Sequence, residues 1–290
     1  MISHVRCRSI LNRVSQPDTW FGLRYNMNLY RGCSHRCIYC DSRSECYGIE
    51  NFDKEVLVKD NAIDLLSDKL PRLRVKGTIG TGSMNDPYQP AERTIRHTRR
   101  ALEVIAGNRF PVHVITKSDL VLRDIDILEE IADVYSAVTF TVTTIDRSLA
   151  GRIEPYSPPV EARFEAIREL SSRGIHAGIT LMPVLPLITD SIDNLNGIVE
   201  QASRYGAEYI IASFGVTLRD RQREYFLREI EKLLPGMGSK YRKLFGSSYL
   251  CRSKNAEQLE AVFTEKCRGM GISTSIPVYD PLDTGQLSLF

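Results

Sequence analysis

The sequence predicts an α/β fold, a partial (β/α)6 barrel of the TIM type followed by a small C-terminal extension. Two observations carry this prediction. Between residues 26 and 214, strand-like runs alternate with helical patterns of roughly 10–15 residues, which is typical of βαβ units and a parallel sheet. About six such units can be counted, too few to close an eight-stranded barrel. A doubly wound open sheet is the second choice.

The expected elements follow one another in a regular order. Apolar or β-branched runs predict strands at residues 26–30, 75–81, 112–116, 137–143, 175–181 and 208–214. Apolar residues at helical spacing predict helices at residues 91–106, 124–133, 160–172 and 191–204. Gly174 ends the third of these helices, and Pro183 ends the strand that follows it.

The alternation stops after residue 234, where a Pro-Gly-Met-Gly run begins. We therefore expect residues 1–234 to form the core, with an N-terminal lead-in, and residues 235–283 to form the extension. One further helix is predicted at 255–269 and a late strand at 272–278. Residues 284–290 form a separate tail.

Composition excludes some classes of function. The chain has 290 residues and a formal net charge of +2, so no global field draws it to nucleic acid or to a membrane. Basic residues do gather locally, at 91–109, 219–223 and 240–243. No run approaches the ~20 apolar residues of a membrane span, and the N-terminus lacks a signal-peptide core. We expect a cytoplasmic protein whose seven cysteines stay reduced or bind metal.

Three cysteines form the most informative motif of the chain. Cys33, Cys37 and Cys40 have the spacing C-x3-C-x2-C and follow the first predicted strand. Four cysteines normally hold a [4Fe–4S] cluster, so three would leave one iron open to a substrate. The alternatives are a zinc site completed by His35 or Cys46, and an electron-transfer cluster with Cys46 as its fourth ligand. The open-iron cluster is the preferred interpretation.

The motif, with Tyr39 before its last cysteine, resembles the radical S-adenosylmethionine (SAM) superfamily. The phrases at 28–40, 85–92, 116–124 and 152–155 resemble its spore photoproduct lyase-like branch, often labelled DNA repair photolyase. The resemblance runs from about residue 8 to 215. It implies a [4Fe–4S] cluster that binds SAM and cleaves it to methionine and a 5′-deoxyadenosyl radical. It also implies a low-potential electron donor of the flavodoxin or ferredoxin type.

The resemblance further implies a role for individual residues. The three cysteines would bind iron and Tyr39 would lie near the adenine. The remaining SAM contacts fall at strand ends: Ser83, Asn85 and Asp86 for the amino group, Lys117 and Ser118 for the carboxylate, and Thr141 or Thr143 for the ribose. Arg152 and Glu154 resemble a pair near SAM or substrate. The usual Gly-Gly-Glu is absent at the amino-group position, where Gly82-Ser-Met-Asn-Asp stands instead.

One departure concerns the end of the reaction. Spore photoproduct lyase carries a hydrogen-donating cysteine on the loop after the second strand. That loop, residues 80–90, has no cysteine here, and Tyr88 is the substitute we consider. We expect the other cysteines, Cys7, Cys46, Cys251 and Cys267, to be small buried hydrophobes. The departure puts the spore photoproduct in doubt as the substrate and leaves the radical chemistry standing.

The last five residues form a second motif. Gln286-Leu-Ser-Leu-Phe290 resembles the peptide by which bacterial repair and replication proteins dock on the DNA sliding clamp. Leu287, Leu289 and Phe290 would enter apolar pockets, and Gln286 would supply a polar contact. The sequence thus predicts a radical SAM enzyme that acts on DNA at a lesion or modified base. The alternatives are a radical SAM enzyme modifying a small molecule or peptide, and a non-catalytic iron–sulfur scaffold.

Overall fold

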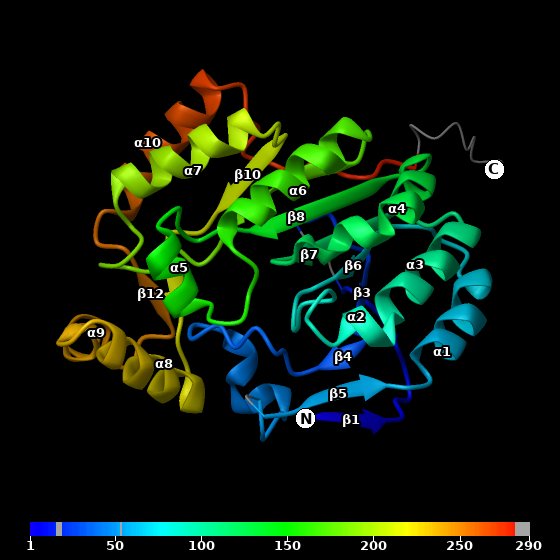
Figure 1. Ribbon diagram of the computed structural model, residues 1–290, viewed down its shortest axis with the longest axis horizontal. Helices are drawn as coiled ribbons and strands as arrows, with labels where there is room; N and C mark the ends of the chain where they lie inside the picture. The colour runs from blue at the N-terminus through cyan, green and yellow to red at the C-terminus, as the bar shows by residue number, and fades with distance from the viewer. Residues whose placement is uncertain (16–18, 53, 282–290) are drawn as a thin grey trace.

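The centre of the computed structural model, which describes residues 1–15, 19–52 and 54–281, is a seven-stranded sheet (Figure 1). Its order is β10-β9-β8-β7-β6-β3-β2. Six neighbouring strands are parallel: β3 (Tyr25–Met27), β6 (Ile79–Thr81), β7 (Val112–Thr116), β8 (Ser136–Thr141), β9 (His176–Leu181) and β10 (Tyr209–Ala212). β2 (Leu11–Arg13) joins one edge antiparallel. Within the described chain β10 and β2 are the edges, so the predicted open six-unit barrel is confirmed.

Helices cover the outer face of this sheet (Figure 1). They are α1 (Ala62–Lys69), α3 (His97–Gly107), α4 (Ile125–Ala132), α6 (Val160–Ser172) and α7 (Ile192–Arg204). Two short helices, α2 (Glu92–Ile95) and α5 (Arg147–Ile153), lie in the connections after β6 and β8. Alternate strand residues such as Val114 and Phe140 pack against helix residues such as Leu102 and Ile167 in the main core. Strands buried on both faces are typical of parallel sheets covered by helices.

Polar side chains and two chain segments fill the inner face. His113 on β7 lies 2.6 Å from the Thr139 hydroxyl, which lies 2.7 Å from the hydroxyl of Tyr209. Burial lowers the pKa of His113 to about 4, so the ring is neutral at physiological pH. Phe21 packs on the His113 ring, and Ile276 packs on Tyr209. The interior of the barrel around His113 and Tyr209 is therefore filled by packed side chains.

Several predicted elements differ from the observed ones. The strand expected at 26–30 is split, because the chain leaves the main sheet and β4 (Tyr30–Arg31) pairs with β5 (Val56–Lys59). β5 also pairs with β1 (Ile2–Val5), and neither was predicted. The helix expected at 91–106 is broken at Arg96, whose φ of 55° lies in the left-handed region.

The C-terminal third contains more structure than the sequence pattern indicated. α8 (Asp220–Leu233), α9 (Met237–Phe245) and the ribbon of β11 (Gly215–Thr217) with β12 (Leu250–Arg252) were not predicted, whereas α10 (Ala256–Gly269) was. The late strand expected at 272–278 is wrong. Only Ser273 bridges to Tyr209, and the Ser273 hydroxyl then accepts a hydrogen bond from the Ser275 amide, which turns the chain away.

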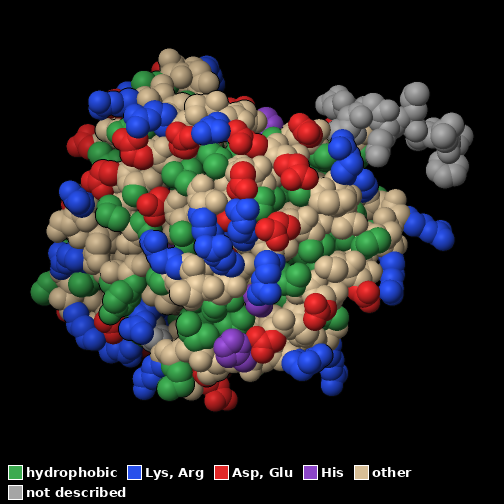
Figure 2. All heavy atoms as spheres, turned by 45° about the vertical axis from the view of Figure 1, so that its right-hand side comes forward, with side chains coloured by type: hydrophobic (Ala, Val, Ile, Leu, Met, Phe, Trp, Pro, Cys, Tyr) green, Lys and Arg blue, Asp and Glu red, His purple; other side chains and the backbone are tan. Residues whose placement is uncertain are grey.

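Charged side chains of both signs share the surface. Figure 2 brings the α1, α3 and α4 side forward and shows basic and acidic side chains interspersed over it. Arg99, from the predicted basic cluster at 91–109, pairs with Asp126 at 2.9 Å and contacts buried Asp124 at 3.3 Å. No helix in the described part of the chain is both long enough and apolar enough to cross a membrane.

Candidate cofactor site

A cavity of about 400 Å³ opens at the carboxyl ends of the parallel strands, the edge where ligands bind in such sheets. Nine of the predicted site residues line it: Cys33, Cys37, Tyr39, Cys40, Ser83, Asn85, Asp86, Lys117 and Thr141. Apolar side chains complete the wall, including Ile115, Met182 and Val216. The structure thus brings together residues from four segments of the chain, of which the first and last, at Cys33 and Thr141, are 108 positions apart.

The cysteine loop supplies one wall of the cavity. Cys33 and Cys37 are buried, and burial raises the pKa of the Cys37 thiol to about 11 and raises that of Cys33 as well. Thiols in such surroundings become thiolates when a metal binds them. No three His, Cys, Asp or Glu side chains in the described chain converge to hold a single ion. In a four-iron cluster each thiolate binds a different iron, so the three cysteines that line the cavity need not converge on one point.

Cys46 does not belong to this wall. Its side chain is exposed, and its sulfur lies 3.3 Å from the Ser44 hydroxyl oxygen. Our expectation of a buried hydrophobe is therefore wrong for Cys46, while Cys251 and Cys267 are buried as expected. The expectation fails because the turn that follows the cysteine loop lies on the surface.

Asp86 fastens the loop after β6 to its neighbours. Its carboxylate accepts hydrogen bonds from the Thr116 hydroxyl at 2.6 Å and the Lys117 amide at 2.7 Å. His35 of the cysteine loop places Nε2 3.3 Å from the same carboxylate. Burial opposes the charge, but His35 and these hydrogen bonds outweigh it and lower the pKa of Asp86 to about 2. Asp86, ionised at neutral pH, therefore joins three segments of the cavity wall.

Gly82 makes the close approach of β6 and β7 possible. Its φ is 106°, in a region that favours glycine, and a Cβ there would lie 2.1 Å from the carbonyl oxygen of Ile115. Both residues line the cavity. The missing side chain thus lets the backbone after β6 lie directly against the end of β7 in the cavity wall.

A buried ion pair between Glu154 and Arg163 supports Tyr39. Its hydroxyl donates to Glu154, and Arg163 of α6 donates to the same carboxylate at 2.6 Å. Arg163 also donates to the carbonyl oxygen of Thr141 at 2.8 Å. Glu154 and Arg163 are 1% and 2% exposed. Glu154 therefore supports Tyr39 and lies outside the cavity lining, as does Thr143, which donates to it at 3.3 Å.

The other predicted residues do not reach the cavity. Arg152 is exposed and donates to the carbonyl oxygen of Leu233. Ser118 is buried and caps the turn after β7 by accepting from the Leu120 amide. Tyr88 is fully buried among charged side chains on the far side of its loop, and it does not line the cavity. The structure gives Tyr88 no access to a substrate radical.

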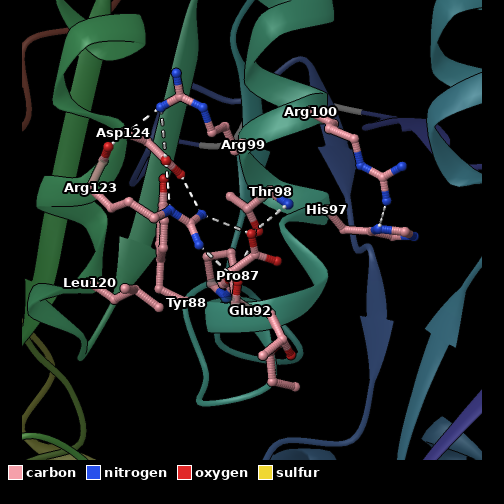
Figure 3. Close-up of polar contacts among 12 residues, drawn as sticks. Pro87, Tyr88, Glu92, His97, Thr98, Arg99, Arg100, Leu120, Arg123 and Asp124 are labelled. Carbon is pink, nitrogen blue, oxygen red and sulfur yellow. Dashed lines mark hydrogen bonds and ion pairs between the residues drawn. The ribbon is translucent and has the colours of Figure 1, made fainter.

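Figure 3 shows what Tyr88 packs against: a network of buried charges that fixes the same loop. Arg123 donates to the carboxylates of Glu92 at 2.9 Å and Asp124 at 2.7 Å, and both acids are fully buried. Its guanidinium lies 5.9 Å from the Tyr88 ring. The segments 85–92 and 116–124 therefore contact and stabilise each other.

Other residues that position the cysteine loop were missed. Gln89 accepts a hydrogen bond from the Ser34 amide at 3.0 Å and donates to the Gly32 carbonyl oxygen at 3.3 Å. From the other side, Gln222 of α8 donates to the Tyr39 carbonyl oxygen at 3.2 Å. Gln89 lies inside a phrase that the resemblance singled out, so a signal existed. Gln222 had none, because its helix was not predicted.

The first turn of α8 makes further bonds to the segment after the last cysteine, beside which it lies in Figure 1. Arg221 donates to the carbonyl oxygen of Arg43 at 2.7 Å, and Asp220 accepts from Ser44 at 2.6 Å. Arg219 donates to Asp41 at 3.2 Å. Together with Gln222, these bonds attach the cysteine loop to a helix far along the chain.

The predicted tail residues Gln286, Leu287, Leu289 and Phe290 lie outside the described residues, and the boundaries predicted at 234 and 283 stay predictions.

Comparison with known sequences identifies the family. The Radical SAM superfamily model matches residues 27–195. An uncharacterized protein of Mycobacterium tuberculosis is 31% identical over 248 residues, which cover 83% of this chain and 72% of the relative. An uncharacterized protein of Methanocaldococcus jannaschii is 34% identical over 191 residues, covering 65% of this chain and 70% of the relative.

Solved structures share the fold. Spore photoproduct lyase complexed with dinucleoside spore photoproduct superposes with a TM-score of 0.70 at 14% identity, covering 94% of this chain and 81% of its own. The radical S-adenosylmethionine methyltransferase TsrM from Kitasatospora setae gives a TM-score of 0.56 at 13% identity, covering 97% of this chain and 57% of its own. With the matched family, the cysteine wall and the open barrel all in agreement, the chain belongs to the radical SAM superfamily and is an enzyme whose cofactors are a [4Fe–4S] cluster and SAM.

Proposed function

We propose that this enzyme acts on DNA, at a damaged or modified base. When bound, the cluster and SAM supply the one-electron cleavage that produces methionine and a 5′-deoxyadenosyl radical. The observation that carries the DNA proposal is a stack of side chains on the rim of the cofactor cavity. It consists of Tyr47, Arg219 and Tyr249, and we call it the rim stack.

The rim stack has the chemistry of a base-binding platform. The Arg219 guanidinium lies 5.4 Å from the ring centroid of Tyr47 and 5.4 Å from that of Tyr249. Tyr47 lines the cofactor cavity, and Tyr249 is 51% exposed. Aromatic rings and guanidinium planes stack on unpaired bases of any sequence. A strand of DNA lying on the rim would therefore place a base beside the cavity mouth.

If DNA is the substrate, the base that reacts would have to be unpaired. The cavity lies at the strand ends behind the rim, and a base inside a duplex cannot reach a reactive group held there. The enzyme would use single-stranded DNA or a nucleotide flipped out of the duplex. Apolar wall residues such as Ile115 and Met182 would exclude water from the radical.

The cofactor contacts are part of the same proposal. Cys33, Cys37 and Cys40 would hold the cluster, and Ser83, Asn85 and Asp86 would face the amino group of SAM. Lys117 lines the cavity with its Nζ 5.6 Å from the Tyr39 ring, a position suited to the SAM carboxylate. Tyr39 would then contact the adenine of SAM, and Thr141 would contact the ribose.

The test is DNA binding by the cluster-loaded protein and by a Tyr249→Ala variant. Loss of one stacking ring should weaken binding to a labelled single-stranded oligonucleotide by about 1–3 kcal/mol, or at least fivefold. Tyr156→Ala is the matched control, because Tyr156 is 55% exposed and its ring also lies beside an arginine, Arg36, but it is not part of the rim stack. If the protein binds neither single-stranded nor duplex DNA at low salt, the proposal fails.

The alternative is a small molecule or a peptide as the substrate. The absence of a cysteine from the loop at 80–90 favours it, since the terminal hydrogen donor of a DNA reaction is then unassigned. Anaerobic turnover with deuterated substrates separates the two. Deuterium recovered in 5′-deoxyadenosine from a labelled oligonucleotide supports DNA, and label from a small molecule alone supports the alternative.

We also propose that the tail docks on the DNA sliding clamp, through Gln286, Leu287, Leu289 and Phe290, and that the enzyme works in the cytoplasm. None of the seven cysteines forms a disulfide, which suits a reducing compartment. The support for clamp docking is the sequence of the tail. Removing residues 286–290 should abolish binding to a purified clamp and leave SAM cleavage unchanged. Equal clamp binding with and without these residues contradicts the proposal.

A further inference from the structure

A second cavity of about 240 Å³ lies on the surface behind the cysteine loop, between residues 43–52 with Lys54 on one side and α8 on the other. Four of its lining side chains are cationic: Arg43, Lys54, Arg221 and Arg228. Glu50 is the one acidic side chain among the described lining residues. We call this cavity the basic hollow.

The basic hollow shares its wall with the cluster site. Ile49 and Phe52 line the hollow and pack against Cys33, and Cys40 contacts the same apolar group. One layer of side chains therefore separates the hollow from two of the three cysteines. The thin wall is notable because the rest of the loop is covered by the barrel and by α8.

Arg43 places a positive charge inside this wall. Its side chain is 4% exposed and lies between two aromatic rings, 4.6 Å from the Phe52 centroid and 3.7 Å from that of Tyr225. It also donates to the carbonyl oxygen of Cys37 at 3.4 Å. A buried cation beside the cysteines favours added negative charge on whatever they hold.

The hollow and the cofactor cavity open separately. Asp41 and Ser42 line the cofactor cavity, whereas Arg43, the next residue, lines the hollow. The two lining sets have no residue in common. A partner seated on the hollow would therefore leave the SAM cavity and the rim stack accessible.

We propose that the basic hollow docks the one-electron carrier that reduces the cluster, a small protein with an acidic surface around a flavin or iron–sulfur group. One electron leaves the carrier, which is oxidised by one electron, and enters the cluster, which is reduced by one; no bond is made or broken in the docked complex. The proposal rests on the radical SAM chemistry and not on DNA as the substrate. Opposite charges give a fast, salt-sensitive encounter, which suits a small and transient interface.

The experiment measures how an acidic flavodoxin binds the cluster-loaded enzyme. The test variant combines Lys54→Glu and Arg228→Glu, two exposed side chains of the hollow. The control combines Arg72→Glu and Arg168→Glu, which are 76% and 64% exposed, lie outside the hollow and change the net charge equally. Binding is followed by calorimetry at low and at physiological salt, and the absorbance of the cluster is recorded to verify that each variant is loaded.

We expect the test variant to bind flavodoxin at least about tenfold more weakly and the control to bind within about twofold of wild type. The affinity of wild type should fall with salt, and that of the test variant should fall less. SAM cleavage driven by dithionite, a small reductant that needs no docking surface, should be equal in all three proteins. Dithionite activity therefore separates failure of docking from failure of the radical chemistry.

Two results overturn the proposal. One is equal weakening of flavodoxin binding in the test and control variants, which would mean that net charge alone decides the affinity. The other is wild-type flavodoxin binding by the test variant together with a loss of DNA affinity, which would assign the hollow to phosphate contacts.

Discussion

Replacing Arg163 by Met tests whether the buried ion pair behind Tyr39 supports the site. Arg163 and Glu154 are almost fully buried, and their nearest atoms are 2.6 Å apart. Removing one partner of a buried pair costs about 3–5 kcal/mol, because the other charge is left without compensation. Lys117 also acts on Glu154 and remains in the variant, so we take the lower end, about 3 kcal/mol. For a protein of this size that lowers the melting temperature by roughly 6–12 °C.

The loss should depend on pH in a defined direction. In the wild type, burial opposes ionisation of Glu154, but the charges of Arg163 and Lys117 outweigh it and hold its pKa below the ordinary value of 4.5. The pair therefore stabilises the fold fully above about pH 4.5 and loses this contribution as the pH falls through the folded pKa. In the variant, burial dominates and raises the pKa. The variant should thus recover stability on acidification, and the difference in melting temperature should narrow from pH 8 to pH 5.

Thermal unfolding followed by circular dichroism, with cluster absorbance recorded in parallel, measures both effects. Arg168→Met is the control on the same helix, since Arg168 is 64% exposed and pairs with exposed Glu165, and it should change stability by less than about 0.5 kcal/mol. Adding Glu154→Gln to Arg163→Met removes the unpaired charge and should restore part of the stability. A difference between wild type and Arg163→Met that is the same at pH 8 and pH 5, or no larger than the control, would refute the reasoning.

Three further changes have defined outcomes. Cys46→Ala should keep the iron content and absorbance of the wild type, because Cys46 is exposed and outside the cavity wall; loss of the cluster would mean four protein ligands. Gly82→Ala should lower stability by more than about 2 kcal/mol and abolish SAM binding measured by calorimetry, because its Cβ would meet the carbonyl oxygen of Ile115 at 2.1 Å; normal binding would show that the loops can part. Arg123→Met should lower the free energy of unfolding, measured in urea, by about 3–5 kcal/mol, because the carboxylates of Glu92 and Asp124 are fully buried and would lose their partner. A decrease below about 1 kcal/mol would contradict the network of buried charges.

The sequence predicted the parts of the molecule that depend on local pattern. The five parallel strands after the first fall inside or within one residue of their predicted ranges, because β-branched runs and helical spacing are properties of short segments. The cysteine spacing, likewise, is local. The first strand was predicted as one element, but β3 and β4 belong to different sheets. Their partners, β6 and β5, lie far along the chain, so no local pattern indicates the break.

The supporting charges could not be recognised in the same way. Glu154 and Tyr88 were expected to act on SAM or substrate, yet both hold loops in place. A polar residue in a conspicuous phrase fits either role, and the distinction depends on partners such as Arg163, whose burial on α6 no local pattern indicates. Arg219 and Gln222 were overlooked for the same reason, because their partners lie in the cysteine loop.

The attachment of the cysteine loop to α8 has a consequence for the order of synthesis. Arg219 bonds Asp41, and Arg221 bonds Arg43, each across 178 positions of the chain. A ribosome adding about 5–20 residues per second takes roughly 10–35 seconds to cover that interval. During that time the nascent loop exposes its thiols without the helix that later closes over it. We therefore expect the cysteine loop to retain a cluster stably only after α8 has been synthesised and has bonded to it.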